Sequence, residues 1–269
     1  YRSFRLNNFL KQKITMKERQ AECVLSVLYT SSAIFSVTGL ICLATIWQYW
    51  AWILNVCISI DCGCILYGIN TFRTFMGGDA KLCHFGVYGL IPTLLIGLCL
   101  GGYHGYRCCI DKSSYILTQV LTYIRIWSDS RLDLFQLFAA QLYHLFWIPA
   151  VFLAVLLCCL SLVHAVLTTD GYYKTCNNYR RRLIQILDSR GREAEVIHNR
   201  LSCGAIFDFM DYLQSDVVVD QNTNWERGKE TDTGFVLRLT IISTWLNFIA
   251  WMFIVLFNIV IARKKFRCC

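Results

Sequence analysis

The chain has 269 residues, of which 56% are hydrophobic and 16% are charged, and its formal net charge is +8. A soluble domain normally has about a quarter of its residues charged. Because the apolar residues here also fall in long blocks, a soluble globular protein is excluded and an integral membrane protein is predicted. The positive charge is explained by membrane orientation and by attraction to anionic inner-leaflet lipids, and the chain has no nucleic-acid-binding motif, so membrane lipids are expected partners and nucleic acid is not.

The chain begins with a polar segment, residues 1–22, that carries six basic and two acidic side chains. It lacks the apolar core of a signal peptide, so none is predicted. The first apolar block then extends from Cys23 to Ile60 without a charge. As a single helix it would be about 57 Å long, nearly twice the thickness of a bilayer core. The block therefore holds either two spans, or one span and apolar structure outside the lipid.

Three later apolar blocks are clear candidates for transmembrane helices, and the charges around them set the number of spans. Residues 103–134 carry four basic and three acidic side chains, and the tail "RKKFRCC" carries four basic ones. Residues 168–232 carry nine basic against eleven acidic side chains. Positive charge close to the spans marks the cytoplasmic side. Both termini and the 103–134 loop are therefore expected inside, which requires an even number of spans and favours four.

The predicted fold is a mainly α-helical membrane protein, a four-transmembrane-helix bundle with a small extracellular β-sheet and a helical second outer loop. A buried re-entrant hairpin over residues 45–60 is the alternative for the end of the first block. The predicted order is a cytoplasmic segment (1–22), a first span (23–44), an extracellular loop with the sheet (45–83), a second span (84–106), a cytoplasmic loop (107–134), a third span (135–167), a second extracellular loop (168–232), a fourth span (233–262) and a cytoplasmic tail (263–269).

The first outer loop begins with aromatic residues and continues as a hairpin. Trp47, Trp50 and Trp52 suit the outer membrane interface, where tryptophan is enriched, and are candidates for interactions. The sequence "ILYGINTFRTFMGGDAKL" between Cys64 and Cys83 predicts a β-prone arm, a turn at residues 77–79 and a return arm. A disulfide between these two cysteines would tie the ends of the hairpin together.

The predicted topology places six cysteines on the outer side, where disulfides form and persist. Cys176 and Cys203 are the only two in the second outer loop, so a bridge between them is the simplest assignment. Cys57 and Cys62 are left over and could pair with each other or with a partner chain. The spacing Cys62-x-Cys64 is unusual for zinc and is not the C-x-x-C of a redox site, so neither a metal nor a cofactor is expected.

The remaining cysteines lie in the spans or on the predicted cytoplasmic side. Those within the spans are expected to be small packing residues. Cys108, Cys109, Cys268 and Cys269 form two juxtamembrane pairs next to basic residues, which is typical of S-palmitoylation sites. Free cytosolic thiols are the alternative for these four.

The second outer loop contains a helical pattern over residues 177–215, which Gly191 is expected to divide into two helices. The loop has a basic run, Arg180, Arg181 and Arg182, and an acidic stretch, "FDFMDYLQSD" (207–216), which give it patches of opposite charge. These charges form either a solvated face with internal ion pairs or a docking surface for a partner.

The stretch "CILYG…LCHFGVYGLIPTLLIGLCLGGYHGYRCC" (64–109) resembles the claudin-like four-span superfamily, and within it the transmembrane protein 179 family. The resemblance continues in the two cysteines of the second outer loop and in a last span that ends in a basic cluster. It implies that both termini are cytoplasmic, that the first loop forms a small outer sheet, and that Cys64 bridges to Cys83. The second outer loop is far longer than claudin loops, which argues against a claudin-type junction.

Three classes of function follow from these features. The expected one is a non-enzymatic accessory or scaffolding subunit of a larger integral membrane protein such as an ion channel or receptor, at the plasma membrane. Small residues in "GLCLGGYHG" (97–105) suit close lateral packing for such a role. The alternatives are a pore-forming subunit of a homo-oligomer and a membrane thiol enzyme. No catalytic residue is proposed, because no nucleophile and base occur in a supporting motif.

Overall fold

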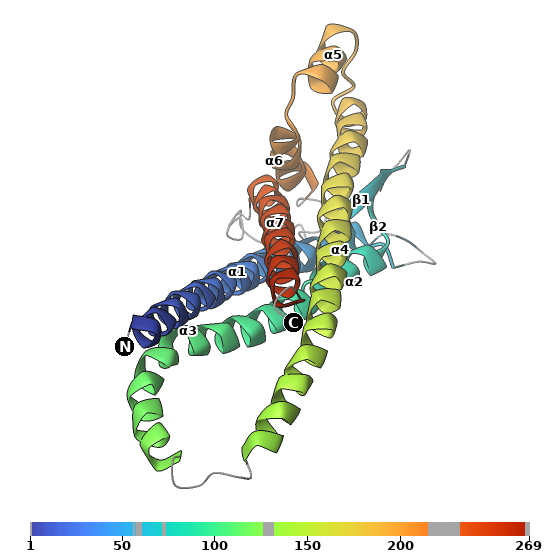
Figure 1. Ribbon diagram of the computed structural model, residues 1–269. Helices are drawn as coiled ribbons and strands as arrows, with labels where there is room; N and C mark the ends of the chain where they lie inside the picture. Colours follow the sequence, from blue (N-terminus) through green and yellow to red (C-terminus); the bar gives the residue numbers. More distant parts are fainter. Residues whose placement is uncertain are drawn as a thin grey trace. The chain divides into compact units, whose positions relative to one another are not determined.

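The computed structural model describes residues 2–55, 57, 61–71, 74–125, 132–214 and 232–266. Side chains are described for residues 20–51, 53–55, 57, 61–71, 74–109, 150–211 and 232–263. The described part is mainly helical and contains one small sheet (Figure 1). Its elements are α1 (Arg2–Leu54), β1 (Cys64–Asn70), β2 (Phe75–Gly78), α2 (Ala80–Tyr88), α3 (Ile91–Arg125), α4 (Leu132–Ile186), α5 (Arg192–Asn199), α6 (Cys203–Gln214) and α7 (Thr233–Phe266).

Four helical stretches are long and apolar enough to cross a membrane, which confirms the mainly helical class with four candidate spans. Such a set of helices indicates a multi-pass membrane protein. The stretches are Gln20–Ala51 in α1, Ala80–Cys109 across α2 and α3, Ala150–Ile186 in α4 and Thr233–Arg263 in α7.

The first helix is longer than the sequence predicts, because it continues past residue 44 to Leu54. Ile46, Trp50 and Leu54 are each fully buried. Their spacing of four residues places them on one face of the helix, where they form part of a buried hydrophobic cluster. The stretch predicted as the start of the first outer loop is thus held in the helix by packing.

The third predicted span also continues as helix, from the expected end at residue 167 to Ile186. Buried side chains recur along this extension at helical spacing, namely Tyr172, Cys176, Tyr179 and Leu183. Gly191 then has φ 61° and precedes α5, so the break expected there is found. A second break follows α5, and α6 begins at Cys203.

The chain forms two compact units, which we describe separately. Unit 1 comprises residues 1–34, 93–159 and 247–269. Unit 2 comprises residues 35–92 and 160–246.

In unit 1, glycines of α3 allow close contact with α1. A Cβ atom at Gly97 would lie 3.1 Å from the carbonyl oxygen of Tyr29, and one at Gly101 would lie 3.0 Å from Cγ2 of Thr30. The Ser26 hydroxyl donates a hydrogen bond to the carbonyl of Gly101 across the same contact. The small residues that we expected to suit lateral packing therefore pack against a helix of their own chain.

Unit 1 also has polar residues inside and apolar residues outside. The Ser32 hydroxyl donates to Oδ1 of Asn247 at 2.7 Å, and both residues are fully buried. Val27, Ile34 and Phe152 are 63–70% exposed. Interhelical hydrogen bonds inside an apolar exterior are typical of helices packed in lipid.

In unit 2, a two-stranded antiparallel sheet lies against helices. β1 pairs with β2, with Cys64 opposite Gly78 and Ile69 opposite Met76, and the register shifts between these pairs. Tyr67 lies within this shift and has φ 61°, a conformation that side chains other than glycine seldom adopt. The edge of β1 is covered by α4, because Thr175 accepts a hydrogen bond from the Gly68 amide and donates one to the carbonyl of Ile65.

Candidate functional site

Three disulfides cross-link one part of unit 2, which we call the cap (Cys57 and Cys62 ahead of β1, then β1, β2, α2, the end of α4, and α6). Cys64 of β1 and Cys83 of α2 are joined with their Cα atoms 5.5 Å apart, and both are fully buried. This bridge holds the first strand against the helix that starts the second candidate span. The sheet is therefore linked covalently to a helix that belongs to a candidate span.

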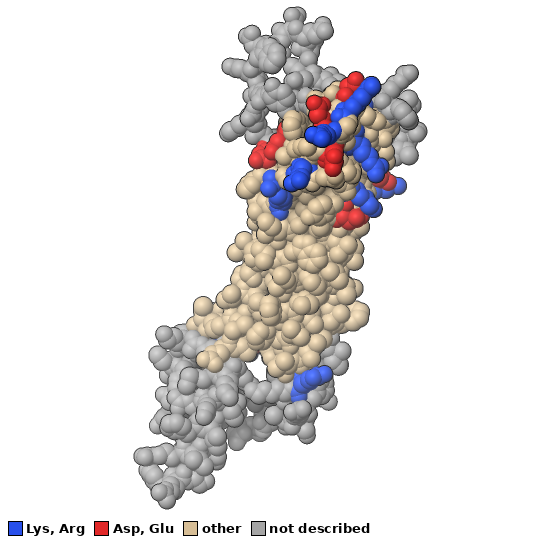
Figure 2. All heavy atoms as spheres, turned by 90° about the horizontal axis from the view of Figure 1, so that it is seen from above, with Lys and Arg blue, Asp and Glu red and all other residues tan. Residues whose placement is uncertain are grey.

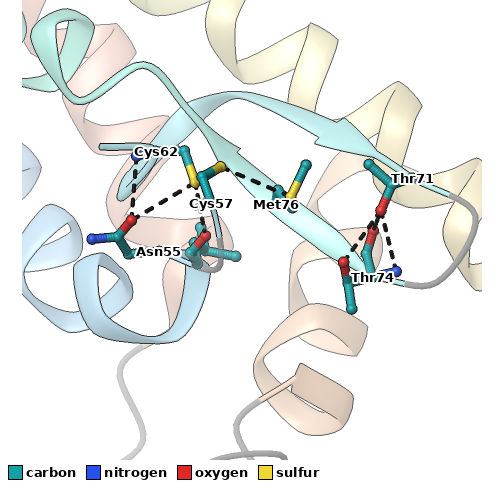
Figure 3. Close-up of a disulfide and its surroundings, with 7 residues drawn as sticks. Asn55, Cys57, Cys62, Thr71, Thr74 and Met76 are labelled. Carbon is teal, nitrogen blue, oxygen red and sulfur yellow. Dashed lines mark hydrogen bonds between the residues drawn. A yellow bond between two sulfur atoms is a disulfide. The ribbon is translucent and has the colours of Figure 1, made fainter. Parts of the chain in front are cut away.

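Cys62 is joined to Cys57, which identifies its partner among the alternatives left open by the sequence (Figure 3). The backbone amide of Cys62 donates to Oδ1 of Asn55, just after the end of α1. On the other side, Sγ of Cys57 lies 3.8 Å from Sδ of Met76 in β2. The bridge thus lies between the end of α1 and the second strand, and it is structural in its surroundings.

Cys176 of α4 is joined to Cys203 at the start of α6. The bridge closes the segment that contains α5 and brings α6 against α4, where Tyr172 and Phe207 stack with ring centroids 5.1 Å apart. All three bridges of the cap use the six cysteines that the predicted topology places on one side of the membrane.

The tryptophans expected at the membrane interface have different roles. Trp50 is fully buried and donates a hydrogen bond from Nε1 to the Thr233 hydroxyl at 2.9 Å. The prediction of an interaction role for Trp50 is therefore wrong, because the packing of α1 against the start of α7 encloses its ring. Trp47 is partly buried and packs edge-on against His84 at 4.6 Å. The side chain of Trp52 lies outside the described residues.

The three arginines of the second loop do not act as one patch. Arg180 is partly buried and donates from Nη2 to the carbonyl of Leu201 at 2.9 Å, so it fixes the backbone between α5 and α6. Arg181 is exposed, and Arg182 is partly buried. Only Arg181 is thus fully available to a partner.

The end of α4 and α5 form a projection with exposed apolar side chains, which we call the tip. No residue of α5 is buried. Ile186, Leu187 and Val196 are 43%, 49% and 50% exposed. Val196 also lines a shallow hollow with Ser189, Arg192, Glu193 and Ile197. The sequence pattern predicted helices here but not which apolar side chains would remain uncovered.

A polar cluster that sequence reasoning missed joins β1 to α4. Lys174 lies 2.9 Å from Asp170, one turn away on the same helix, and its ammonium lies 4.9 Å from the centre of the Tyr67 ring. Burial raises the pKa of Tyr67 to about 12, and the hydrogen bond to Asp170 and its charge act in the same direction. The phenol therefore stays protonated as a donor, and the cluster holds the irregular backbone at Tyr67. The only signal in the sequence was the i,i+4 spacing of Asp170 and Lys174.

A second missed group is Asp211 of α6. Its Oδ2 accepts a hydrogen bond from the Thr233 backbone amide at 2.9 Å, at the start of α7. Because Trp50 donates to the hydroxyl of the same threonine, this contact connects α6, α7 and α1. Burial raises the pKa of Asp211 to about 6, the charges of Asp232 and Asp208 add to the rise, and the hydrogen bonds from Thr233 oppose it.

One further disulfide among the described residues lies in unit 1 and not in the cap. Cys23 of α1 and Cys108 of α3 are joined with Cα atoms 5.3 Å apart. While Cys108 is bonded to Cys23 its sulfur cannot form a thioester, so the lipidation of Cys108 stays a prediction for the reduced pair only. Cys109 is a free, exposed cysteine, so its lipidation stays a prediction. Cys268 and Cys269 lie outside the described residues.

Among the described side chains, no group of three or more His, Cys, Asp or Glu residues could hold a metal ion. The candidate site is therefore the cap with its tip, a covalently braced surface for contacts. Comparisons of this chain with protein-family models, curated proteins and solved structures give no match.

Proposed function

We propose that this chain is a non-enzymatic, claudin-like four-span membrane protein that acts as an accessory or scaffolding subunit of a larger membrane complex, an ion channel or receptor. We place it in the plasma membrane with both termini in the cytoplasm and the cap outside. The four apolar helices and the polar interior of unit 1 support the membrane part of this proposal.

The charges of α4 indicate where this helix leaves the lipid. From residue 134 to Thr169 the sequence of the helix has no charged residue, a length of about 54 Å, which is more than the hydrocarbon core of a bilayer requires. Charges begin at Asp170, so the rest of the helix, about 25 Å, rises out of the membrane and carries the tip. Figure 2 shows most of the described charged side chains gathered together, beside a wide surface without them.

The observation that carries the accessory role is the exposure of Ile186, Leu187 and Val196 on the tip. These side chains lie beyond the charges that mark the lipid boundary, so lipid does not cover them. A cluster of exposed apolar side chains in water is typical of a protein–protein contact. The Cys176–Cys203 disulfide closes the segment that carries this surface, which restricts its movement relative to α4 and suits a docking surface.

The experiment is a mild-detergent purification of the full chain from native membranes, followed by mass spectrometry. We expect a larger membrane protein in fixed ratio, and we expect Val196→Asp to release it. Glu195→Gln, on the same exposed helix, is the matched control and should retain the partner.

A symmetric ring of this chain alone that conducts ions in bilayers would refute the accessory role and favour the pore-forming alternative. Retention of the same partner by Val196→Asp would show that the tip is not the contact.

A further inference from the structure

The four disulfides in the described part of the chain fall on opposite sides of the candidate spans. Cys57, Cys62, Cys64 and Cys83 lie around the segment that joins the first span to the second. Cys23 lies near the start of the first span, and Cys108 lies near the end of the second. Two consecutive spans place these two groups at opposite membrane faces, whichever way the chain is oriented.

The two membrane faces differ in redox chemistry. Disulfides persist in oxidising compartments, whereas cytosolic thiols are kept reduced by glutathione and thioredoxin. The basic residues 1–22 and the basic tail place the Cys23 side in the cytoplasm. The cap disulfides are then permanent, while the Cys23–Cys108 pair faces the cytosolic thiol pool.

The surroundings of this pair keep its two sulfurs together without the bond. The carboxylate of Glu22, next to Cys23, forms a salt bridge with Nη1 of Arg107 at 3.2 Å and also pairs with Nδ1 of His104. His104 in turn stacks on Tyr29 of α1. With the glycine contacts at Gly97 and Gly101, these interactions hold α1 and α3 together in either redox state. Both cysteines are also partly exposed, so a small thiol reagent can reach them.

We propose that Cys23 and Cys108 form a reversible thiol–disulfide site that responds to the cytosolic glutathione couple. The thiolate of one cysteine attacks glutathione disulfide, which forms a mixed disulfide and releases one glutathione thiolate. The thiolate of the other cysteine then attacks the protein sulfur of this mixed disulfide and releases the second glutathione. Each thiol loses one proton, the two protein sulfurs are oxidised, and one glutathione disulfide is reduced to two glutathione molecules. The site rests on the four-span topology of the proposed function but not on the accessory role.

The test counts oxidised cysteines of the full chain in intact cells. Free thiols are blocked with N-ethylmaleimide, the membranes are dissolved, disulfides are reduced, and the new thiols are tagged with a maleimide polymer that slows the chain on a gel. We expect six tags in resting cells, from the cap, and eight after diamide has oxidised the cellular glutathione. On removal of diamide the count should return to six.

Cys23→Ser and Cys108→Ser should each remove the two additional tags, whereas Cys109→Ser, the matched control, should keep them. A count that stays at six under diamide overturns the proposal. A count of eight in resting cells that diamide does not change also overturns it, because the bond would then be permanent.

An epitope tag on either terminus separates a failure of topology from a failure of the site. Antibody binding only after permeabilisation supports the cytosolic position of the pair. Binding to intact cells would place Cys23 and Cys108 in the oxidising compartment and would overturn the proposal, while the partner experiment above would remain open to its own result.

Discussion

Two opposing effects act on the charge of the Asp211 carboxylate: hydrogen bonds stabilise it and burial destabilises it. Its Oδ2 accepts the first backbone amide of α7, where the positive end of the helix dipole favours a carboxylate. Burial nevertheless raises its pKa to about 6, with added effects from Asp232 and Asp208. Burial therefore outweighs the hydrogen bonds, and the group titrates in a range that an exposed aspartate does not reach.

The raised pKa predicts a stability change between about pH 4 and pH 6. An unfolded aspartate has a pKa of about 3.9, so in this interval the folded state binds the proton more tightly. The stabilisation is fully present below about pH 4, decreases as the pH rises, and is lost above about pH 6. Because the side chain is partly exposed, we expect a loss on the order of 1 kcal/mol.

The measurement is the thermal midpoint in detergent between pH 4 and pH 7, compared with Asp211→Asn. The difference between the two proteins should follow the titration of Asp211, while Asp188→Asn, at an exposed site that does not act on Asp211, should keep the wild-type dependence. Parallel curves for wild type and Asp211→Asn would contradict the assignment.

At the scale of elements, helix contacts in unit 1 depend on which glycines face α1. A Cβ atom at Gly101 would meet Thr30 Cγ2 at 3.0 Å and the Thr30 amide nitrogen at 3.3 Å. The neighbouring Gly102 has nothing within 4 Å. Gly101 therefore makes the contact with α1, and the adjacent Gly102, which does not, serves as its control.

We predict that Gly101→Leu separates α1 from α3 and destabilises the protein by about 1–3 kcal/mol, the usual cost of overpacking. Gly102→Leu should be neutral or slightly stabilising, because leucine is a better helix former than glycine. Thermal unfolding in detergent measures both. Equal effects of the two substitutions would show that this glycine contact is not made.

The cap disulfides should differ in their contribution to stability according to the segments that they close. Cys176 and Cys203 are 27 residues apart, whereas Cys57 and Cys62 are 5 apart. In the chain-entropy account, the longer closure stabilises by about 3.5 kcal/mol and the shorter by about 2 kcal/mol. We therefore expect Cys176→Ser with Cys203→Ser to lower the unfolding free energy more than Cys57→Ser with Cys62→Ser. The reverse order in denaturant titrations would contradict this account.

Much of the secondary structure could be predicted from the sequence, because charge-free blocks are local signals. The predicted turn at residues 77–79 is wrong, because Gly77 and Gly78 pair within β2 and the hairpin reverses between Asn70 and Phe75. The ends of α1 and α4 could not. Trp50 and Tyr179 continue these helices because they find a buried environment made by distant segments. The same holds for the Cys23–Cys108 pair, whose members are 85 residues apart and meet only because α1 and α3 pack closely. Asp211 and Thr233 likewise meet through tertiary contact alone.

At the scale of the whole molecule, topology is the property on which the other proposals depend. Four candidate spans place both termini on one side and both inter-span segments that carry the cap on the other. In the proposed topology, the distribution of basic residues assigns the terminal side to the cytoplasm. The chain has no N-x-[ST] acceptor of its own, so an introduced one reports its side without background.

We predict that Glu193→Asn combined with Glu195→Thr creates a glycan acceptor on α5 that is modified in cells. No residue of this helix is buried, and it lies beyond the part of α4 that the charges place outside the lipid, so the acceptor is accessible to the glycosylation machinery. A glycosidase-sensitive decrease in gel mobility measures the modification. The same acceptor sequence in a tail fused after Cys269 should stay unmodified, because the proposed topology places that end in the cytoplasm. Modification of the tail with an unmodified α5 would show that the chain has the opposite orientation. Modification of both would show that the number of spans is odd.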